Sequence, residues 1–254
     1  MTGILDGKVA VVTGAAGTIG SATCLLMAAR GAQIVAVDRP GADFSELRKT
    51  IDPGKFLSVE ADIAEADEVQ AYVDRALAFG SRIDILFNNA GIVGPVSPLT
   101  DCAIEDFRNV MRINVEGMFL GLKYVLPHMI EQRCGSVINT ASIAGSAAMP
   151  GVTAYTTSKH AVLGLTRSAA VEVAQYGVRV NCINPGPIEG PLISSVDGAR
   201  AADQLKREQI IPSRRYGRPA EVARLVAFLA CDDAAYINGS VHCVDGGLNA
   251  LRAT

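Results

Sequence analysis

The chain has 254 residues, of which 49% are hydrophobic and 19% are charged, and these proportions exclude a disordered or fibrous protein. Its 23 basic and 26 acidic residues give a formal net charge of −3 without a long basic run, so we expect no nucleic-acid partner. Its apolar stretches are shorter than the roughly 20 residues that cross a membrane, so we expect no membrane partner either.

Short runs of β-branched and other apolar residues recur along the chain and predict seven strands. Their apolar character is nearly continuous, which is typical of strands that helices cover on both faces. Helix-length segments separate them, and in residues 66–79 the apolar side chains recur at helical spacing. This alternation predicts an α/β, doubly wound Rossmann fold with a parallel sheet between two helical layers. The predicted strands are 9–14, 33–38, 56–62, 83–89, 136–142, 178–186 and 240–247.

No linker, repeat or change of composition divides the chain, so we expect residues 1–254 to form a single domain. Residues 188–212 are too long for a tight connection between the last two strands. Because they leave the carboxyl end of a strand, we interpret them as a substrate loop with a short helix in 199–211. A plain surface insertion is the alternative.

The segment TGAAGTIG follows the first predicted strand and opens a helix. Gly14, Gly17 and Gly20 let the backbone turn tightly, and the amides at a helix start attract a pyrophosphate. Asp38 ends the second strand, 38 − 20 = 18 residues after Gly20, close to the roughly 20 expected for an acid that binds a ribose hydroxyl. This spacing favours NAD over NADP, although Arg39 could instead receive a ribose 2′-phosphate.

The segment YTTSK places Tyr155 and Lys159 four residues apart in a predicted helix, on one face. A neighbouring ammonium group lowers the pKa of a phenol, which makes it a usable acid or base. Taken alone, the pair also fits a half-buried tyrosine beside a surface lysine. Ser142 favours the catalytic interpretation, because it ends the fifth strand at the edge where such a sheet presents its site.

These segments, with NNAG at 88–91, Asn114 within INVEG and NPG at 184–186, resemble the ordered motifs of the short-chain dehydrogenase/reductase family. The resemblance covers essentially the whole chain. It implies a nicotinamide cofactor and hydride exchange between an alcohol and a carbonyl, and it implies a homotetramer. The apolar residues of 105–132 and 153–176, such as Met118, Leu122, Val162 and Val173, favour an assembly surface on these segments.

The resemblance also implies the roles of individual residues. Tyr155 would be the general acid/base, and Lys159 would lower its pKa and hold the nicotinamide ribose. Ser142 would bind the substrate oxygen, and Asn114 would hold a water in the proton relay. The implied cofactor-binding residues are Gly14, Gly17, Thr18, Ile19, Gly20, Asp38, Asp62, Ile63, Asn89, Gly91, Tyr155, Lys159, Pro185, Gly186 and Ile188.

Two positions depart from the family pattern. Thr18 stands where the family usually has its middle glycine, which is tolerable because residue 18 begins a helix. The absence of a basic residue just before it again favours NAD. Gly190 stands where a threonine is common, so a contact to the carboxamide is missing. We expect a looser hold on the cofactor, or a substitute from Ser194 or Ser195.

The sequence therefore predicts an NAD-dependent oxidoreductase that acts on a secondary alcohol or ketone. The residues expected around the substrate are mostly apolar or small, which favours an alicyclic or aromatic-derived alcohol. One alternative is a reductase of an acyl-chain or acyl-carrier 3-oxo substrate, and another is a non-catalytic protein that senses dinucleotides. The complete set of Ser142, Tyr155 and Lys159 argues against the second, because a binding protein needs no polarised phenol.

Six cysteines lie far apart without a CxxC pair, and no residues show the spacing of a metal site. The first residues lack the basic start and apolar core of an export signal. We therefore expect a cytoplasmic protein with reduced thiols and no bound metal.

Overall fold

In the computed structural model, which describes residues 3–191 and 208–252, seven parallel strands form one sheet in the order β3-β2-β1-β4-β5-β6-β7. The strand order reverses between β1 and β4, which is where doubly wound sheets form their ligand crevice. Every predicted strand is confirmed, with shorter bounds for most of them. The strands are β1 Val9–Thr13, β2 Gln33–Asp38, β3 Phe56–Glu60, β4 Ile85–Asn88, β5 Gly135–Thr140, β6 Val178–Pro185 and β7 Val241–Val244.

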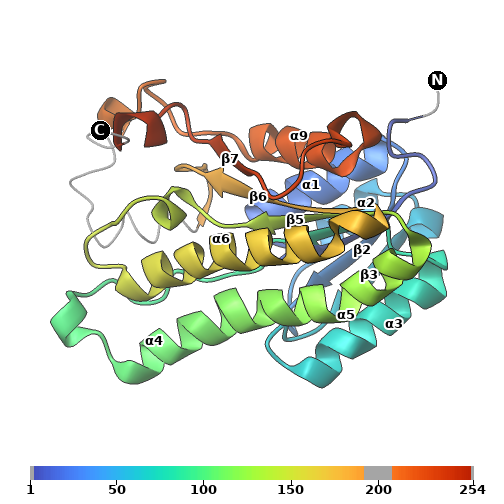
Figure 1. Ribbon diagram of the computed structural model, residues 1–254, viewed down its shortest axis with the longest axis horizontal. Helices are drawn as coiled ribbons and strands as arrows, with labels where there is room; N and C mark the ends of the chain where they lie inside the picture. Colours follow the sequence, from blue (N-terminus) through green and yellow to red (C-terminus); the bar gives the residue numbers. More distant parts are fainter. Residues whose placement is uncertain (1–2, 192–207, 253–254) are drawn as a thin grey trace.

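Helices cover both faces of the sheet, as predicted. Helices α1 and α9 lie on one side, whereas α3, α4, α5 and α6 lie on the other (Figure 1). The predicted helix 66–79 corresponds to α3, which is amphipathic. The helices are α1 Thr18–Ala29, α2 Ser45–Thr50, α3 Ala66–Gly80, α4 Ile104–Met111, α5 Gly117–Gln132, α6 Thr153–Val173 and α9 Pro219–Ala230.

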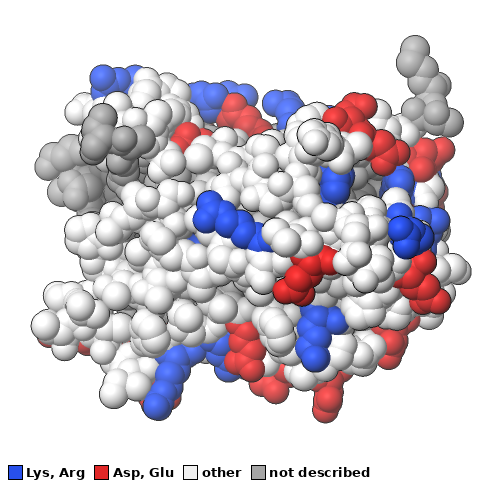
Figure 2. All heavy atoms as spheres, in the orientation of Figure 1, with Lys and Arg blue, Asp and Glu red and all other residues white. Residues whose placement is uncertain are grey.

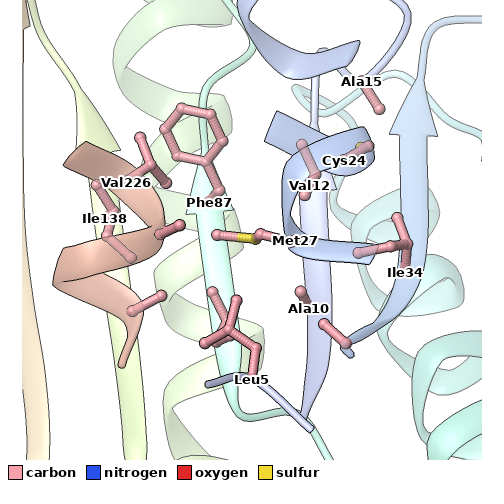
Figure 3. Packing of buried hydrophobic residues seen from close by; sticks show 14 of the residues in the cluster. Leu5, Ala10, Val12, Ala15, Cys24, Met27, Ile34, Phe87, Ile138 and Val226 are labelled. Carbon is pink, nitrogen blue, oxygen red and sulfur yellow. The ribbon is translucent and has the colours of Figure 1, made fainter. Parts of the chain in front are cut away.

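The core has two main clusters, one on each face of the sheet. Successive residues of a strand point to opposite faces, so Val12 packs in one cluster and Val11 in the other. Figure 3 shows the first cluster, in which Met27 of α1 and Val226 of α9 lie near Phe87 of β4. Because both faces are buried, most strand positions are apolar, which explains the apolar runs in the sequence.

The segment 105–132 does not form one continuous α-helix. α4 ends at Met111, a π-helical turn spans Arg112–Glu116, and α5 begins at Gly117. The wider turn contains Asn114, whose side chain is fully buried. Single π-helical turns within helices are frequent at functional sites.

The prediction that Met118, Leu122, Val162 and Val173 contribute to an assembly surface was wrong. All four are buried inside the chain, because α5 and α6 pack on the sheet and on each other. The exposed apolar side chains of this helical layer belong instead to Ile104, Phe107, Phe119 and Val171. No helix within the described residues is long and apolar enough to span a membrane.

Asp84 joins the start of β4 to the start of β1. Its side chain, only 1% exposed, accepts a 2.9 Å hydrogen bond from the amide of Val9 and pairs with Arg82 at 2.6 Å. The substitution Asp84→Ala leaves a buried amide without an acceptor, so the free energy of unfolding should fall by about 1–3 kcal/mol. Asp84→Asn keeps an oxygen for Val9 and should lose less. Chemical denaturation compares the two variants, and equal losses would contradict this account.

Candidate active site

The predicted site residues meet at one edge of the sheet. The segments that follow the carboxyl ends of β1, β4, β5 and β6 carry the glycine-rich turn, the NNAG segment, Ser142 and Gly186. The long helix α6 brings Tyr155 and Lys159 to the same edge. The structure thus gathers residues from positions 14 to 188 at one edge of the sheet, where doubly wound folds bind their ligands.

The glycine-rich turn is closely packed, and its N-cap residue makes no side-chain hydrogen bond to the first amides of α1. Gly14 has a φ of +64°, and a Cβ there would lie 3.0 Å from the Cα of Ala90. A Cβ at Gly20 would lie 2.0 Å from the carbonyl oxygen of Gly14. Gly17 precedes the first turn of α1, where Thr18 and Ile19 present backbone amides that have no acceptor within the helix. The turn therefore fits a pyrophosphate, which such amides and the helix dipole attract.

Asp38 is held rigidly beside this turn. Its two carboxylate oxygens accept hydrogen bonds from the amides of Ala16, at 2.9 Å, and Arg39, at 2.8 Å. The side chain of Asp38 is only partly buried, and Arg39 is exposed. The carboxylate keeps further lone pairs for a ribose hydroxyl.

On the adenine side of the predicted crevice, Asp62 accepts from the amide of Ala64 at 3.0 Å and pairs with Arg112 at 3.2 Å. Ile63 is buried, and its side chain packs closely against the backbone of Gly117. A Cβ on Gly117 would lie 2.7 Å from Ile63 Cδ1. Arg112 also pairs with Glu65 at 2.9 Å, so it links this segment to the π-helical turn. The sequence analysis did not identify Arg112, because its partners lie about 50 residues away.

Asn89 ties the ends of three neighbouring strands together. Its amide donates to the hydroxyl of Thr13 at 2.9 Å, and its side-chain nitrogen donates to the Thr13 carbonyl at 3.1 Å. The hydroxyl of Thr140 donates to its side-chain oxygen at 3.3 Å. Thr13 and Thr140 were missed in the sequence, where each simply ends an apolar run.

Asn114 fastens the NNAG segment to α6. Its side-chain oxygen accepts from the amide of Ile92 and its side-chain nitrogen donates to the carbonyl of Ile92, each at 2.8 Å. The same nitrogen donates to the hydroxyl of Ser158 at 3.0 Å. A Cβ on Gly91 would lie 3.0 Å from the Asn114 oxygen, so the backbone approaches closely there. Both amide hydrogens of Asn114 are used, which leaves its side chain no hydrogen to donate to a relay water. Ser158, the residue before Lys159 in YTTSK, was also missed, and its hydroxyl donates to the Tyr155 carbonyl at 2.7 Å.

Ser142, Tyr155 and Lys159 lie together. Ser142 lies beside the phenol of Tyr155, close enough to lower its pKa. The ammonium of Lys159 lies 5.5 Å from the Tyr155 ring centre and donates to the Thr140 carbonyl at 2.8 Å. Lys159 is only 3% exposed. This arrangement can exchange a proton with an oxygen that Ser142 holds near the phenol.

In the protein without its cofactor, burial is the largest influence on the pKa values of Tyr155 and Lys159. It raises the pKa of Tyr155, and the neighbouring Ser142 acts in the opposite direction. Burial also lowers the pKa of Lys159 to about 8, against a weaker opposing effect of Cys182. The expected lowering of the Tyr155 pKa is therefore not a property of the chain alone, because desolvation outweighs the other effects.

The segment after β6 is anchored at both described ends. Pro185 is buried, Gly186 packs against Asp245, and Ile188 pairs with Gly217 in a short parallel bridge. Ile211 belongs to a buried cluster with Ile143, which follows Ser142 directly. Residues 208–210 are helical, whereas Ser194, Ser195 and most of the predicted helix 199–211 lie outside the described residues. Among the residues that the structure covers, no group of three or more His, Cys, Asp or Glu could hold a metal ion.

Comparison with known proteins identifies the family. A family model described as enoyl-(acyl carrier protein) reductase matches residues 14–249. The chain belongs to the short-chain dehydrogenase/reductase family. As a member it is an oxidoreductase of alcohols and ketones with a nicotinamide dinucleotide cofactor, which confirms the function expected from the sequence at that level.

Two relatives and two solved structures resemble this dehydrogenase over nearly their full length. Levodione reductase of Leifsonia aquatica is 39% identical over 96% of this chain and 94% of its own length. Cyclohexanol dehydrogenase of Acinetobacter sp. (strain SE19) is 36% identical over 97% of this chain and 96% of its own. The crystal structure of levodione reductase has a TM-score of 0.94 at 37% identity, covering 97% of this chain and 99% of that one. The crystal structure of NAD+-bound xylitol dehydrogenase has a TM-score of 0.88 at 36% identity, covering 96% and 99%.

Proposed function

We propose that this dehydrogenase interconverts a cyclic secondary alcohol and its ketone with NAD, using Tyr155 as the general acid/base. The observation that carries this proposal is the placement of Ser142 and the Tyr155 phenol beside the buried ammonium of Lys159, which lies 5.5 Å from the Tyr155 ring centre. The names of cyclohexanol dehydrogenase and levodione reductase fit an alicyclic alcohol and a ketone as substrates.

Each residue has a defined task in this reaction. The nicotinamide ring, when bound, accepts hydride from the alcohol carbon or returns it to the ketone. Ser142 orients the substrate oxygen, and Tyr155 takes its proton during oxidation and gives it back during reduction. Lys159 favours the phenolate form and is proposed to hold the nicotinamide ribose. Asn114 positions this group by fixing Ser158 and, through it, the first turns of α6.

The remaining predicted cofactor residues are proposed to surround the dinucleotide. The amides of the glycine-rich turn would bind the pyrophosphate, and Asp38 would accept from the adenosine ribose. Segments near the adenine and the nicotinamide would complete the site. These are Asp62, Ile63, Asn89, Gly91, Pro185, Gly186 and Ile188.

A second candidate function is the reduction of an acyl-chain or acyl-carrier 3-oxo substrate, which the description of the matching family model favours. Turnover of cyclic ketones, linear 3-oxoacyl thioesters and polyols with NADH and NADPH separates the candidates. We expect the highest kcat/KM for a cyclic ketone with NADH. A higher kcat/KM for a thioester would favour the second candidate, and binding of NADH without any turnover would favour a sensing protein.

The choice of NAD rests on Asp38, and this gives a prediction. Its carboxylate would repel the 2′-phosphate of NADP, whereas it would accept hydrogen bonds from the ribose of NAD. Asp38→Ala should lower kcat/KM with NAD about 10- to 100-fold, the loss expected for a charged hydrogen bond, and should raise kcat/KM with NADP.

The control is Asp38→Asn, which removes the charge but keeps an oxygen for the amide of Ala16. It should raise activity with NADP as Asp38→Ala does, with less damage to the turn. A preference of the unaltered enzyme for NADP would show that Arg39 determines the choice.

We also propose that the enzyme is a cytoplasmic homotetramer. All six cysteines are free thiols, which supports a reducing location. Phe107 and Phe119 line one hollow on the α4–α5 face, and Phe119 is 47% exposed. Exposed apolar side chains clustered in this way mark interaction surfaces. The view in Figure 2, by contrast, shows Lys and Arg interspersed with Asp and Glu, without a field of one sign.

Analytical ultracentrifugation tests the assembly. The enzyme should sediment with four times the 26.5 kDa mass of the chain. Phe119→Glu should reduce that mass, because a charge would be buried in the interface. The control substitution Lys49→Glu, at an exposed position on α2 away from this hollow, should leave it unchanged. A monomeric enzyme at micromolar concentration would exclude the tetramer.

A further inference from the structure

The two departures from the family pattern touch each other. A Cβ built on Gly190 would lie 2.7 Å from the Thr18 hydroxyl oxygen, 3.0 Å from Thr18 Cγ2 and 3.2 Å from Thr18 Cβ. The side chain of Thr18 therefore occupies the space that a side chain at position 190 would take. Gly190 also has a φ of +148°, a conformation that residues with a Cβ rarely adopt.

This contact spans the proposed cofactor site. Thr18 opens α1 directly after the glycine-rich turn, and Gly190 follows β6. β4 and β5 separate β1 from β6 in the sheet, so the contact joins segments that flank the carboxyl ends of both. Thr18 is exposed, and its hydroxyl has no hydrogen-bond partner within the described part of the chain. An unengaged hydroxyl thus stands between the pyrophosphate turn and the start of the 188–212 segment.

We propose that Thr18 supplies from α1 the hydroxyl that position 190 lacks, and that it donates this hydroxyl to the nicotinamide mononucleotide half of the cofactor. The inference rests on the proposed NAD site. A threonine at the first position of a helix lies beside the amides that attract phosphate, so its hydroxyl points into the same region. Thr18 and Gly190 then depend on each other: the hydroxyl has moved from position 190 to position 18, and residue 190 must be small, because a larger one would displace the Thr18 side chain.

Two substitutions at Thr18 separate hydrogen bonding from packing. Thr18→Val keeps the shape and removes the hydroxyl, whereas Thr18→Ser keeps the hydroxyl and removes a methyl group. Calorimetric titration with NAD should show binding about 10-fold weaker in Thr18→Val, the loss of one hydrogen bond to a ligand. Thr18→Ser should bind nearly as the unaltered enzyme does. AMP, which lacks the nicotinamide half, should bind all three proteins equally.

A double-substitution cycle tests whether the side chains of residues 18 and 190 exclude each other. Gly190→Thr should weaken NAD binding strongly in the unaltered enzyme, because the new Cβ meets Thr18. The same change should cost less in a Thr18→Gly background, where the space is free. The unfavourable φ of residue 190 is present in both backgrounds and cancels in the comparison.

The outcomes decide between the two proposals. Failure of the unaltered enzyme to bind NAD would overturn the proposed function itself. If that enzyme binds NAD and Thr18→Val binds it equally well, the role of the Thr18 hydroxyl is refuted. Equal losses for NAD and AMP would also refute it, since the substitution would then have disturbed the whole turn. Additive effects in the cycle would refute the exchange between positions 18 and 190.

Discussion

Tyr155→Phe is expected to lower kcat for oxidation of a secondary alcohol by at least about 10²–10⁴-fold, the range typical for loss of an acid/base group. The substitution removes the hydroxyl beside Ser142 but keeps the ring beside Lys159. NAD should therefore still bind with nearly unchanged affinity. Steady-state kinetics and a direct binding titration measure the two quantities separately.

Tyr176→Phe is a suitable control, because Tyr176 lies in the 3-10 turn that follows the C-terminal end of α6, at the opposite end of this helix from Tyr155. It should retain full activity. Substantial activity of Tyr155→Phe, with intact NAD affinity, would refute the catalytic assignment and would leave a dinucleotide-sensing protein as the better account.

Lys159→Met is expected to change the pH dependence of the same reaction. Oxidation needs the phenolate, so log kcat/KM should rise with pH at unit slope and then level off. In the unaltered enzyme, Lys159 and the positive charge of bound NAD should together bring the effective pKa below the usual value of about 10. This effect must overcome the burial that raises the Tyr155 pKa in the protein alone. Without Lys159 the rising limb should move to higher pH, and NAD should bind more weakly.

The same substitution should stabilise the fold at neutral pH. Lys159 has a folded pKa of about 8 and a reference value of 10.5. Below pH 8 both states are protonated, so the folded state bears the whole cost of a buried charge. Between these two values the folded protein loses its proton first, and the cost falls as pH rises. Lys159→Met should therefore raise Tm most below pH 8 and progressively less above it. A rate profile that does not move, or a lower Tm at pH 7, would contradict this assignment.

The fold could be predicted from the sequence because burial restricts the residue types that individual positions can hold. Strands covered on both faces are mostly apolar, so β1 and β2 were visible as nearly continuous apolar runs. Gly14 and Gly20 were equally visible, since the positive φ of Gly14 and the close contacts of both residues admit no side chain. Ser142, Tyr155 and Lys159 could be placed together because parallel strands end at one edge and α6 puts positions four apart on one face.

Other features depend on contacts between distant segments and leave no local pattern. The π-helical turn at Asn114 accompanies hydrogen bonds to Ile92 and Ser158, 22 and 44 residues away. The apolar residues of α5 looked like an exposed surface, because their number alone does not reveal that both the sheet and α6 cover them. Thr18 and Gly190 were recognised separately, but their contact spans 172 residues, by 190 − 18, and required the folded chain.

Transfer of hydrogen isotope tests the central claim most directly. Cyclic secondary alcohols with deuterium on the alcohol carbon, cyclohexanol among them, are incubated with the enzyme and NAD, and the dinucleotide is analysed by mass spectrometry. The account predicts NADH that carries one deuterium from the alcohol, formed by the unaltered enzyme and strongly reduced in Tyr155→Phe. Ketone formation without deuterium in NADH, or no labelled NADH from any of these alcohols in an enzyme that binds NAD, would contradict it.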